Sequence, residues 1–313
     1  MKKRLLIIAG PTAVGKTDMG IILADKLNGE IISADSMQIY KNMDIGTAKP
    51  NLKERKGVIH HLIDIINPDE NFSVAEFQRL AKGIIDDLIS NKKLPIIVGG
   101  TGLYINSLIY DMDFTQSVSN RRLREILQEE AENMGNEYIH NKLRKIDPDL
   151  ADRIHPNNIR RVIRAIEVYH ETGDKIGDFS KDIVLSDEYE FFLAGLTRER
   201  RELYDRINTR VDIMIEQGLI EEIRNLLNLG YSKDLISFKG LGYKEIIGYL
   251  EGNYDLNEAI RILKRNTRRY AKRQLTWFRR YAGINWYNVS DYPAGQNLAE
   301  HIIEDFKGYF NLL

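Results

Sequence analysis

The sequence contains no cysteine in its 313 residues, which removes disulfides, thiolate metal sites and a cysteine nucleophile from consideration. This absence is consistent with a reducing compartment. Long apolar runs are also missing, and none reaches the roughly 18 residues that a membrane-spanning helix requires. The apolar run at residues 5–8 is too short for a signal peptide and continues directly into a glycine-rich loop. We therefore expect a cytoplasmic protein without a membrane segment.

An excess of one charge is lacking as well, because 45 Lys and Arg residues face 46 Asp and Glu residues, for a formal net charge of −1. A polyanionic partner would therefore have to bind a local basic patch rather than the protein as a whole. The length favours one large domain or two, and the composition is that of a globular protein.

A glycine-rich loop follows the first apolar run, residues 4–9, which predicts a buried strand. The loop matches the Walker A pattern G-x-x-x-x-G-K-[ST], and apolar residues at helical spacing come after it. Glycines let backbone N–H groups point inward, while Lys16 and the helix N-terminus supply positive charge. The hydroxyl of Thr17 is suited to Mg²⁺. We expect a diphosphate or triphosphate to bind at Gly10, Pro11, Thr12, Ala13, Val14, Gly15, Lys16 and Thr17.

Two further strands are expected to end at the same edge of the sheet. One runs over residues 30–35 and ends at Asp35, and the other runs over residues 94–98 and ends in Gly99-Gly-Thr-Gly102, which presents Thr101 among residues too small to block a ligand. Functional groups collect at the carboxyl edge of parallel strands. The alternative for Asp35 is a helix N-cap. A nucleotide hydrolase or kinase would hold Mg²⁺ through an Asp at such a strand end, where glycine stands here.

The middle of the chain changes character near residue 115. Charged helices are predicted at 121–133, 137–146 and 158–172, and strand character returns at 191–196. The rest of the chain predicts helices, the longest over about 256–281, and a late strand at 284–289. We expect an α/β core built from residues 1–114 and 187–313, with a helical C-terminal part and an inserted helical domain at 115–186.

The long C-terminal helix carries a local basic patch. Residues 259–282 contain nine Lys or Arg residues, no acid and four interleaved aromatic residues. Such a stripe is suited to a nucleic-acid backbone, with aromatic side chains available for unpaired bases. The alternative is an ordinary solvated helix face. Arg206 and Arg210, four residues apart on another predicted helix, are spaced to clamp a phosphate, although surface arginines are common.

Taken in order, the motifs of this chain resemble those of the bacterial tRNA dimethylallyltransferases. The likeness runs nearly the whole chain and is loosest in the insertion, up to about residue 155. The motifs that carry it lie at residues 10–17, 35–38, 43–50, 72–77, 99–104, 161–167, 242–245 and 270–278.

The resemblance implies that a dimethylallyl group passes from dimethylallyl diphosphate to the exocyclic amine of the adenosine 3′ to the anticodon of tRNA. It implies a P-loop kinase-like parallel sheet whose glycine-rich loop holds the isoprenoid diphosphate, with Mg²⁺ at Thr17. It also implies a helical insertion that closes on the anticodon stem-loop, and we expect a monomer. Whether ATP can occupy the loop stays open.

The resemblance also assigns roles to residues that match the family's motifs. Asp35 is the general base, Thr101 lies near the transferred group, and Arg206 or Arg210 joins Lys16 in stabilising the departing diphosphate. The residues implied to bind tRNA are Asp35, Ser36, Met37, Gln38, Thr101, Arg121, Arg124, Arg160, Arg161, Val162, Ile163, Arg164, Gly240, Gly242, Tyr243, Lys244, Lys272, Arg273, Gln274 and Trp277.

Two other classes of protein stay open on the residues alone. One is a small-molecule kinase, which is disfavoured by the glycine that follows the predicted strand at residues 94–98. The other is an RNA-binding module whose loop only senses nucleotide, which an acid beside the loop disfavours.

Overall fold

The computed structural model describes residues 2–112, 120–173, 184–292 and 298–312. The chain folds into two compact units. We call the first, Met1–Ile109 with Ser186–Leu313, the core unit, and the second, Tyr110–Leu185, the inserted unit. The sequence predicted an insertion at 115–186.

The core unit is built on a six-stranded sheet, in the order β3-β2-β4-β1-β5-β6, in which all neighbouring strands are parallel. The predicted α/β class with a parallel sheet is confirmed. Since β1 lies between β4 and β5, the loop after β1 meets the carboxyl ends of both neighbours. The strands are β1 (Lys3–Ala9), β2 (Gly29–Ala34), β3 (His60–His61), β4 (Leu94–Gly99), β5 (Tyr189–Thr197) and β6 (Ile284–Asn288).

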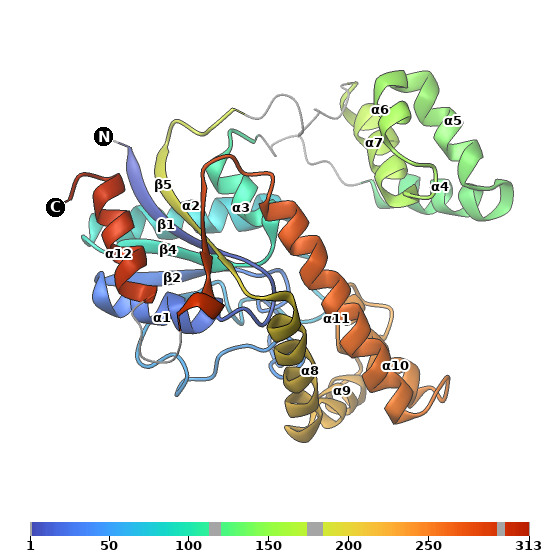
Figure 1. The fold of residues 1–313 in the computed structure, drawn as a ribbon. Helices are drawn as coiled ribbons and strands as arrows, with labels where there is room; N and C mark the ends of the chain where they lie inside the picture. The colour runs from blue at the N-terminus through green and yellow to red at the C-terminus, as the bar shows by residue number, and fades with distance from the viewer. Residues whose placement is uncertain (1, 113–119, 174–183, 293–297, 313) are drawn as a thin grey trace. The chain divides into compact units, whose positions relative to one another are not determined.

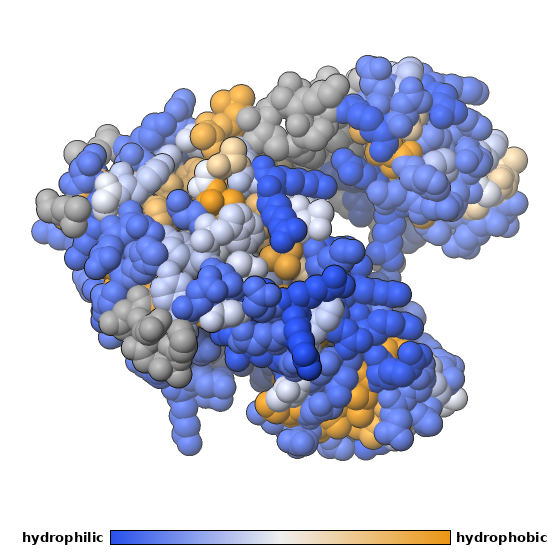
Figure 2. Space-filling view, viewed as in Figure 1, coloured by the Kyte–Doolittle hydropathy of each residue, from blue (hydrophilic) through white to orange (hydrophobic). Residues whose placement is uncertain are grey.

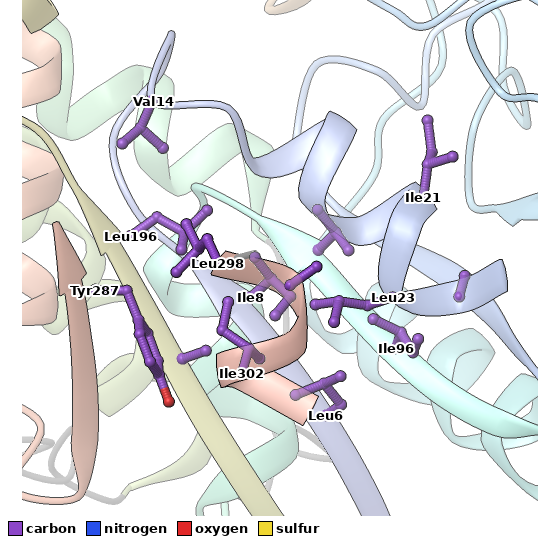
Figure 3. Close-up of a cluster of buried hydrophobic side chains, with 14 of the residues drawn as sticks. Leu6, Ile8, Val14, Ile21, Leu23, Ile96, Leu196, Tyr287, Leu298 and Ile302 are labelled. Atoms are coloured by element: carbon purple, nitrogen blue, oxygen red, sulfur yellow. The ribbon is translucent and has the colours of Figure 1, made fainter. Parts of the chain in front are cut away.

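Helices cover both faces of this sheet, which is why its central strands are continuous apolar runs. Figure 1 shows α1 (Lys16–Lys26) and α12 (Leu298–Tyr309) on one face, and α2 (Val74–Ser90) and α3 (Gly102–Ile109) on the other. In Figure 3, Leu6 and Ile8 of β1 pack with Leu23 of α1 and Ile302 of α12. The sequence pattern did not predict α12, although it completes this core.

A second apolar core joins the C-terminal helices to the loop after β2. Buried Phe238, Tyr243 and Leu263 pack with Ile39 and Met43 of that loop. The loop therefore lies between the sheet edge and the helices. These helices are α8 (Arg200–Glu216), α9 (Leu219–Asn228), α10 (Tyr243–Leu250) and α11 (Leu256–Phe278), with a short 3₁₀ turn η1 at Ser237–Lys239.

The inserted unit has an apolar core of its own. Buried Leu127, Ile139, Leu143 and Val162 lie at its centre. The three predicted helices are present, and a short fourth helix, α6, begins after Asp147, whose carboxylate accepts a hydrogen bond from the N–H of Leu150 (3.1 Å). The helices are α4 (Arg121–Met134), α5 (Asn136–Ile146), α6 (Pro148–Arg153) and α7 (Ile159–Thr172).

Among the described residues, no helix combines the length and the apolar character that crossing a membrane would take.

Two glycines allow a test of how tightly the sheet edge is packed. A Cβ atom added at Gly99 would lie 2.1 Å from the carbonyl oxygen of Ala34 on β2, whereas one added at Gly83 in α2 would meet no atom within 4 Å. We expect Gly99→Ala to lower the free energy of unfolding by about 1–3 kcal/mol, because the strands must shift. We expect Gly83→Ala to raise it by about 0.5–1 kcal/mol, because alanine favours helix. Chemical denaturation followed by circular dichroism measures both, and equal effects would contradict this account.

Candidate active site

The glycine-rich loop connects β1 to α1 at the carboxyl edge of the sheet. Gly10 has a φ of 152°, and a Cβ atom there would lie 2.6 Å from the carbonyl oxygen of Leu196 on β5. Gly15 caps α1 with a φ of 110°, a conformation that favours glycine. The two glycines of the Walker A pattern thus let the loop turn tightly against the sheet.

Side chains from distant parts of the chain hold this loop in place. Gln274 of α11 accepts a hydrogen bond from the N–H of Thr12 (2.9 Å) and donates one to the carbonyl oxygen of Gly100 (3.0 Å). The guanidinium of Arg206 donates to the carbonyl oxygen of Ala13 (3.0 Å). Arg198, just before α8, donates to the carbonyl oxygen of Val14 (3.0 Å). These bonds fix the backbone of the loop and bring guanidinium groups against it.

The cationic side chains around the loop influence one another's pKa values. The ammonium of Lys16 donates to the carbonyl oxygen of Pro11 (2.8 Å). Burial lowers the pKa of Lys16 to about 8, an effect that the carboxylate of Asp35 opposes and the guanidinium of Arg210 reinforces. Burial and the nearby Arg206 lower the pKa of Arg210. Positive charge is thus concentrated at the N-terminus of α1, where an anionic ligand would be stabilised.

A pocket of about 360 Å³ opens beside the loop within the core unit. It is formed by the loop, the segment after β2, the turn before α10 and one face of α8 and α11. The predicted site residues that line it are Thr12, Lys16, Thr17, Asp35, Ser36, Met37, Gln38, Arg210, Gly240, Gly242, Tyr243, Lys244, Arg273 and Gln274.

Thr101 bonds to the residues on either side of Asp35, at the start of the loop after β2. One carboxylate oxygen of Asp35 accepts a hydrogen bond from the N–H of Met37 (2.9 Å), a local turn in keeping with the capping alternative, yet Asp35 also lines the pocket. The hydroxyl oxygen of Thr101 accepts from the N–H of Ser36 (3.1 Å). The N–H of Thr101 donates to the carbonyl oxygen of Ala34 (3.1 Å). Thr101 therefore fixes the backbone that carries Asp35.

Gln38, on the same loop, has its amide held by three contacts. It accepts a hydrogen bond from the hydroxyl of Ser33 (3.2 Å) and donates to the carbonyl oxygens of Thr47 and Ala48 (3.4 Å each). The orientation of this amide is therefore set by the protein before any ligand binds.

The glycines after β4 have a different purpose from the one the sequence suggested. We expected them to leave room for a ligand beside Thr101. A Cβ atom at Gly100 would lie 2.2 Å from the amide nitrogen of Gln274, and one at Gly102 would lie 2.1 Å from the indole nitrogen of Trp277. The room that these glycines leave is filled by side chains of α11.

The basic stripe on α11 is partly neutralised. Arg261 pairs with Glu258 (2.5 Å) and Lys264 with Asp212 (2.6 Å), so the first half of the stripe is closer to the solvated-face alternative. Figure 2 shows strongly hydrophilic residues over α11. Towards its C-terminal end Lys272 is exposed and Arg273 lines the pocket.

Several predicted RNA-binding residues prove to be packed inside the protein. Val162 and Ile163 are buried in the inserted unit, and Gln274 is only 7% exposed. Their side chains are therefore used in packing and in internal hydrogen bonds. Tyr243 is also buried, but it forms part of the pocket wall.

The remaining predicted residues of the inserted unit lie on α4 and α7. Arg121 begins α4, and Arg160 and Arg161 occupy the first turn of α7, where both are exposed. Arg124 and Arg164 bind the same buried carboxylate, that of Glu167. The structure thus brings Arg124 and Arg164 together.

Glu222, which no sequence pattern indicated, joins two motifs of the site. Glu222 of α9 accepts hydrogen bonds from the N–H groups of Asp44, Ile45 and Gly46 (2.9, 2.7 and 3.1 Å). It also accepts one from the hydroxyl of Tyr243 (2.7 Å). It thereby holds the motif at 43–50 against the motif at 242–245, and the presence of both motifs was the only signal of this link.

A matching family model and the similarity to known proteins agree with the geometry. The model described as "IPP transferase" matches residues 38–281. The chain is 72% identical over 313 residues to the tRNA dimethylallyltransferase of Alkaliphilus oremlandii and 62% identical over 312 residues to that of Alkaliphilus metalliredigens, with 100% of each chain covered in both cases.

Solved structures show the same likeness. The full-length tRNA isopentenylpyrophosphate transferase of Bacillus halodurans matches with 46% identity and a TM-score of 0.74, covering 99% of both chains. A eukaryotic dimethylallyltransferase acting on tRNA matches with 32% identity and a TM-score of 0.83, covering 99% of this chain and 80% of its own. These similarities confirm the resemblance drawn from the motifs, and the chain belongs to the IPP transferase family.

Proposed function

We propose that this protein transfers a dimethylallyl group from dimethylallyl diphosphate to the exocyclic amine of the adenosine 3′ to the anticodon in tRNA, releasing diphosphate. The observation that carries this proposal is a pocket in which Asp35 shares the space with Lys16 and Arg210 of the diphosphate site. Its relatives are named as enzymes of this reaction. We further propose that the protein acts as a monomer in the cytoplasm.

The glycine-rich loop and its cations serve the leaving group. As the carbon–oxygen bond of the allylic diphosphate breaks, negative charge grows on the diphosphate oxygens. Fixed donors are worth most where charge develops in the transition state. Lys16 at the helix N-terminus and Arg210 in the pocket wall are placed for this, with Arg206 bound to the backbone of the loop beside them.

Asp35 serves the attacking amine. An adenine amine is a weak nucleophile because its lone pair is delocalised into the ring. As the new nitrogen–carbon bond forms, the amine proton passes to a carboxylate within hydrogen-bond reach. Asp35 accepts one backbone hydrogen bond and, as a carboxylate, can accept more. Thr101 positions it through the backbone of Ser36.

The residues of the site also fit a Mg²⁺ ion. Within the described parts of the chain, no group of three or more His, Cys, Asp or Glu side chains is placed to hold a metal by itself. Mg²⁺ on a diphosphate usually takes only one or two protein oxygens and keeps several waters. The hydroxyl of Thr17, which lines the pocket beside Lys16, would supply one. When bound, the ion would neutralise charge on the diphosphate.

The target adenosine must leave the base stack, since its amine has to enter the pocket. Flipping a base costs a few kcal/mol, which contacts to the rest of the RNA offset. We propose that Ser36, Met37 and Gln38 meet the flipped base, and that Lys272 and Arg273 meet the backbone. The amide oxygen of Gln38, which accepts one hydrogen bond from Ser33, can accept a second from a base edge.

The function is tested by incubating the protein with dimethylallyl diphosphate, Mg²⁺ and unmodified tRNA, followed by mass spectrometry of the nucleosides. A dimethylallyl adenosine at the position 3′ to the anticodon is the expected product. A parallel sample receives ATP in place of the isoprenoid. Phosphate transfer from ATP without any prenylated nucleoside would favour the kinase alternative and overturn the proposal.

Asp35→Asn tests the general base. Asparagine keeps the oxygen that accepts from the N–H of Met37, so the loop should retain its shape, but it cannot take the amine proton. We expect the rate of transfer to fall by roughly 10²–10⁴-fold while tRNA affinity stays unchanged. Asp25→Asn, on the exposed side of α1, is the matched control and should keep full activity. A parallel fall in tRNA affinity would instead assign Asp35 to recognition.

The lowered pKa of Lys16 predicts a pH dependence of substrate binding. This pKa of about 8 lies below the ordinary value of 10.5, and the diphosphate prefers the charged ammonium. Above pH 8 the free protein loses this proton, so the affinity for dimethylallyl diphosphate should fall, approaching about tenfold per pH unit up to about pH 10.

Calorimetric titration from pH 7 to pH 10 measures this affinity. Lys16→Met should bind weakly and show no inflection near pH 8. Lys26→Gln, at the far end of the same helix, should keep the wild-type profile. A wild-type affinity that does not change over this interval would contradict the assignment of Lys16.

A further inference from the structure

The inserted unit contains a fully buried carboxylate that contacts two of the arginines predicted to bind tRNA. Glu167 of α7 is 0% exposed. Its Oε1 accepts hydrogen bonds from the backbone N–H of Asn120 (2.8 Å) and from Nε of Arg124 (2.8 Å). Its Oε2 accepts one from a terminal guanidinium nitrogen of Arg164 (2.7 Å). Two arginines from two helices, α4 and α7, thus meet at one carboxylate.

We propose that Glu167 is a positioning residue that holds Arg124 and Arg164 in one fixed arrangement for a phosphate of the RNA. This inference rests on the proposed function, because it takes tRNA as the substrate. It adds a residue that does not itself touch the RNA.

The charges of this cluster match a phosphodiester. Burial raises the pKa of Glu167, but the hydrogen bonds from Arg124, Arg164 and the N–H of Asn120 outweigh burial and hold the pKa below its ordinary value. The group is therefore an ionised carboxylate. Two guanidinium groups share this carboxylate, and the anionic oxygens of a phosphodiester would be attracted to both.

The side chains of Arg124 and Arg164 are partly exposed, as binding to RNA requires. Their side chains are 45% and 34% exposed, although both contact a carboxylate that is 0% exposed. Each arginine side chain therefore extends between the buried carboxylate and the surface. An arginine fork held in advance loses less conformational entropy on binding, and its planar donors suit phosphate oxygens.

A purely structural role for Glu167 is the competing explanation. Glu167 also binds the N–H of Asn120, the N-cap residue of α4, and could simply join the two helices. The two explanations predict different effects on RNA binding. If Glu167 only joins the two helices, its loss affects RNA binding only by unfolding the inserted unit. If Glu167 positions the arginines, its loss weakens RNA binding even when the protein stays folded.

The test compares Glu167→Gln with Glu171→Gln, one turn further along α7. Glu171 accepts a hydrogen bond from the side-chain amide of Asn120 (2.6 Å) and, among the described residues, forms no ion pair with Arg124 or Arg164. Both variants remove one negative charge from the same helix. By net charge alone, both should bind RNA more tightly. The proposal predicts that only Glu167→Gln binds more weakly.

The affinity for an unmodified anticodon stem-loop is measured over a series of KCl concentrations. We expect Glu167→Gln to weaken RNA binding by about tenfold or more. The slope of log affinity against log salt concentration should fall by the equivalent of about one to two phosphate contacts. The RNA affinity of Glu171→Gln should match or exceed that of the wild type. Unchanged or tighter binding by a folded Glu167→Gln would overturn the proposal. The turnover number at saturating tRNA should stay near the wild-type value, since the chemistry lies in the core unit.

A second variant decides the matter if Glu167→Gln does not fold. The double variant Arg124→Lys with Arg164→Lys keeps the carboxylate and both charges but removes the planar forks. It should lose affinity and salt slope in the same way, and wild-type binding by this variant would overturn the proposal. A wild-type protein that fails to bind the stem-loop would instead contradict the proposed function, and this inference would fall with it.

Discussion

The candidate active site depends on two hydrogen bonds formed by the side-chain amide of Gln274. It joins the N–H of Thr12 in the glycine-rich loop to the carbonyl oxygen of Gly100 after β4, and it does so from α11, more than 170 residues away in the chain. The amide is buried, so both hydrogen bonds must be present for it to be stable there. The loop, the sheet edge and the C-terminal helices therefore hold their places together.

The docking of Gln274 at this edge of the sheet explains why the chain has no acid at the end of β4. A kinase or nucleotide hydrolase would use an acid at the end of β4, and this chain has glycine at positions 99 and 100. Any side chain at Gly100 would collide with Gln274, and one at Gly102 would collide with Trp277. The place of the Mg²⁺-binding acid is thus used to dock α11, which contributes Arg273 and Tyr270 to the pocket wall.

The parts that could be predicted from sequence are those set by short-range patterns. Apolar runs gave the central strands, and the Walker A spacing gave the loop, because each depends on residues that are neighbours in the chain. Gln274 could not be assigned in this way, since it stands among Lys and Arg residues that suggest a solvated face. The link from Glu222 to residues 44–46 spans about 176 residues, and no local pattern contains it. The short β3 is likewise defined by its pairing with β2, which no local pattern shows.

Glu222 and Glu167 show one principle at work in both units. Among the described residues, each carboxylate accepts hydrogen bonds from side chains that we propose to serve ligand binding and from backbone N–H groups. Glu167 is fully buried and Glu222 is partly buried. A carboxylate that is removed from water is unstable unless its donors are in place, so its burial favours their geometry. A ligand set as highly charged as a diphosphate and an RNA backbone needs cations and N–H groups that are already fixed. We propose that these glutamates fix such groups without contacting the ligands, and in sequence they cannot be distinguished from the many glutamates on helix surfaces.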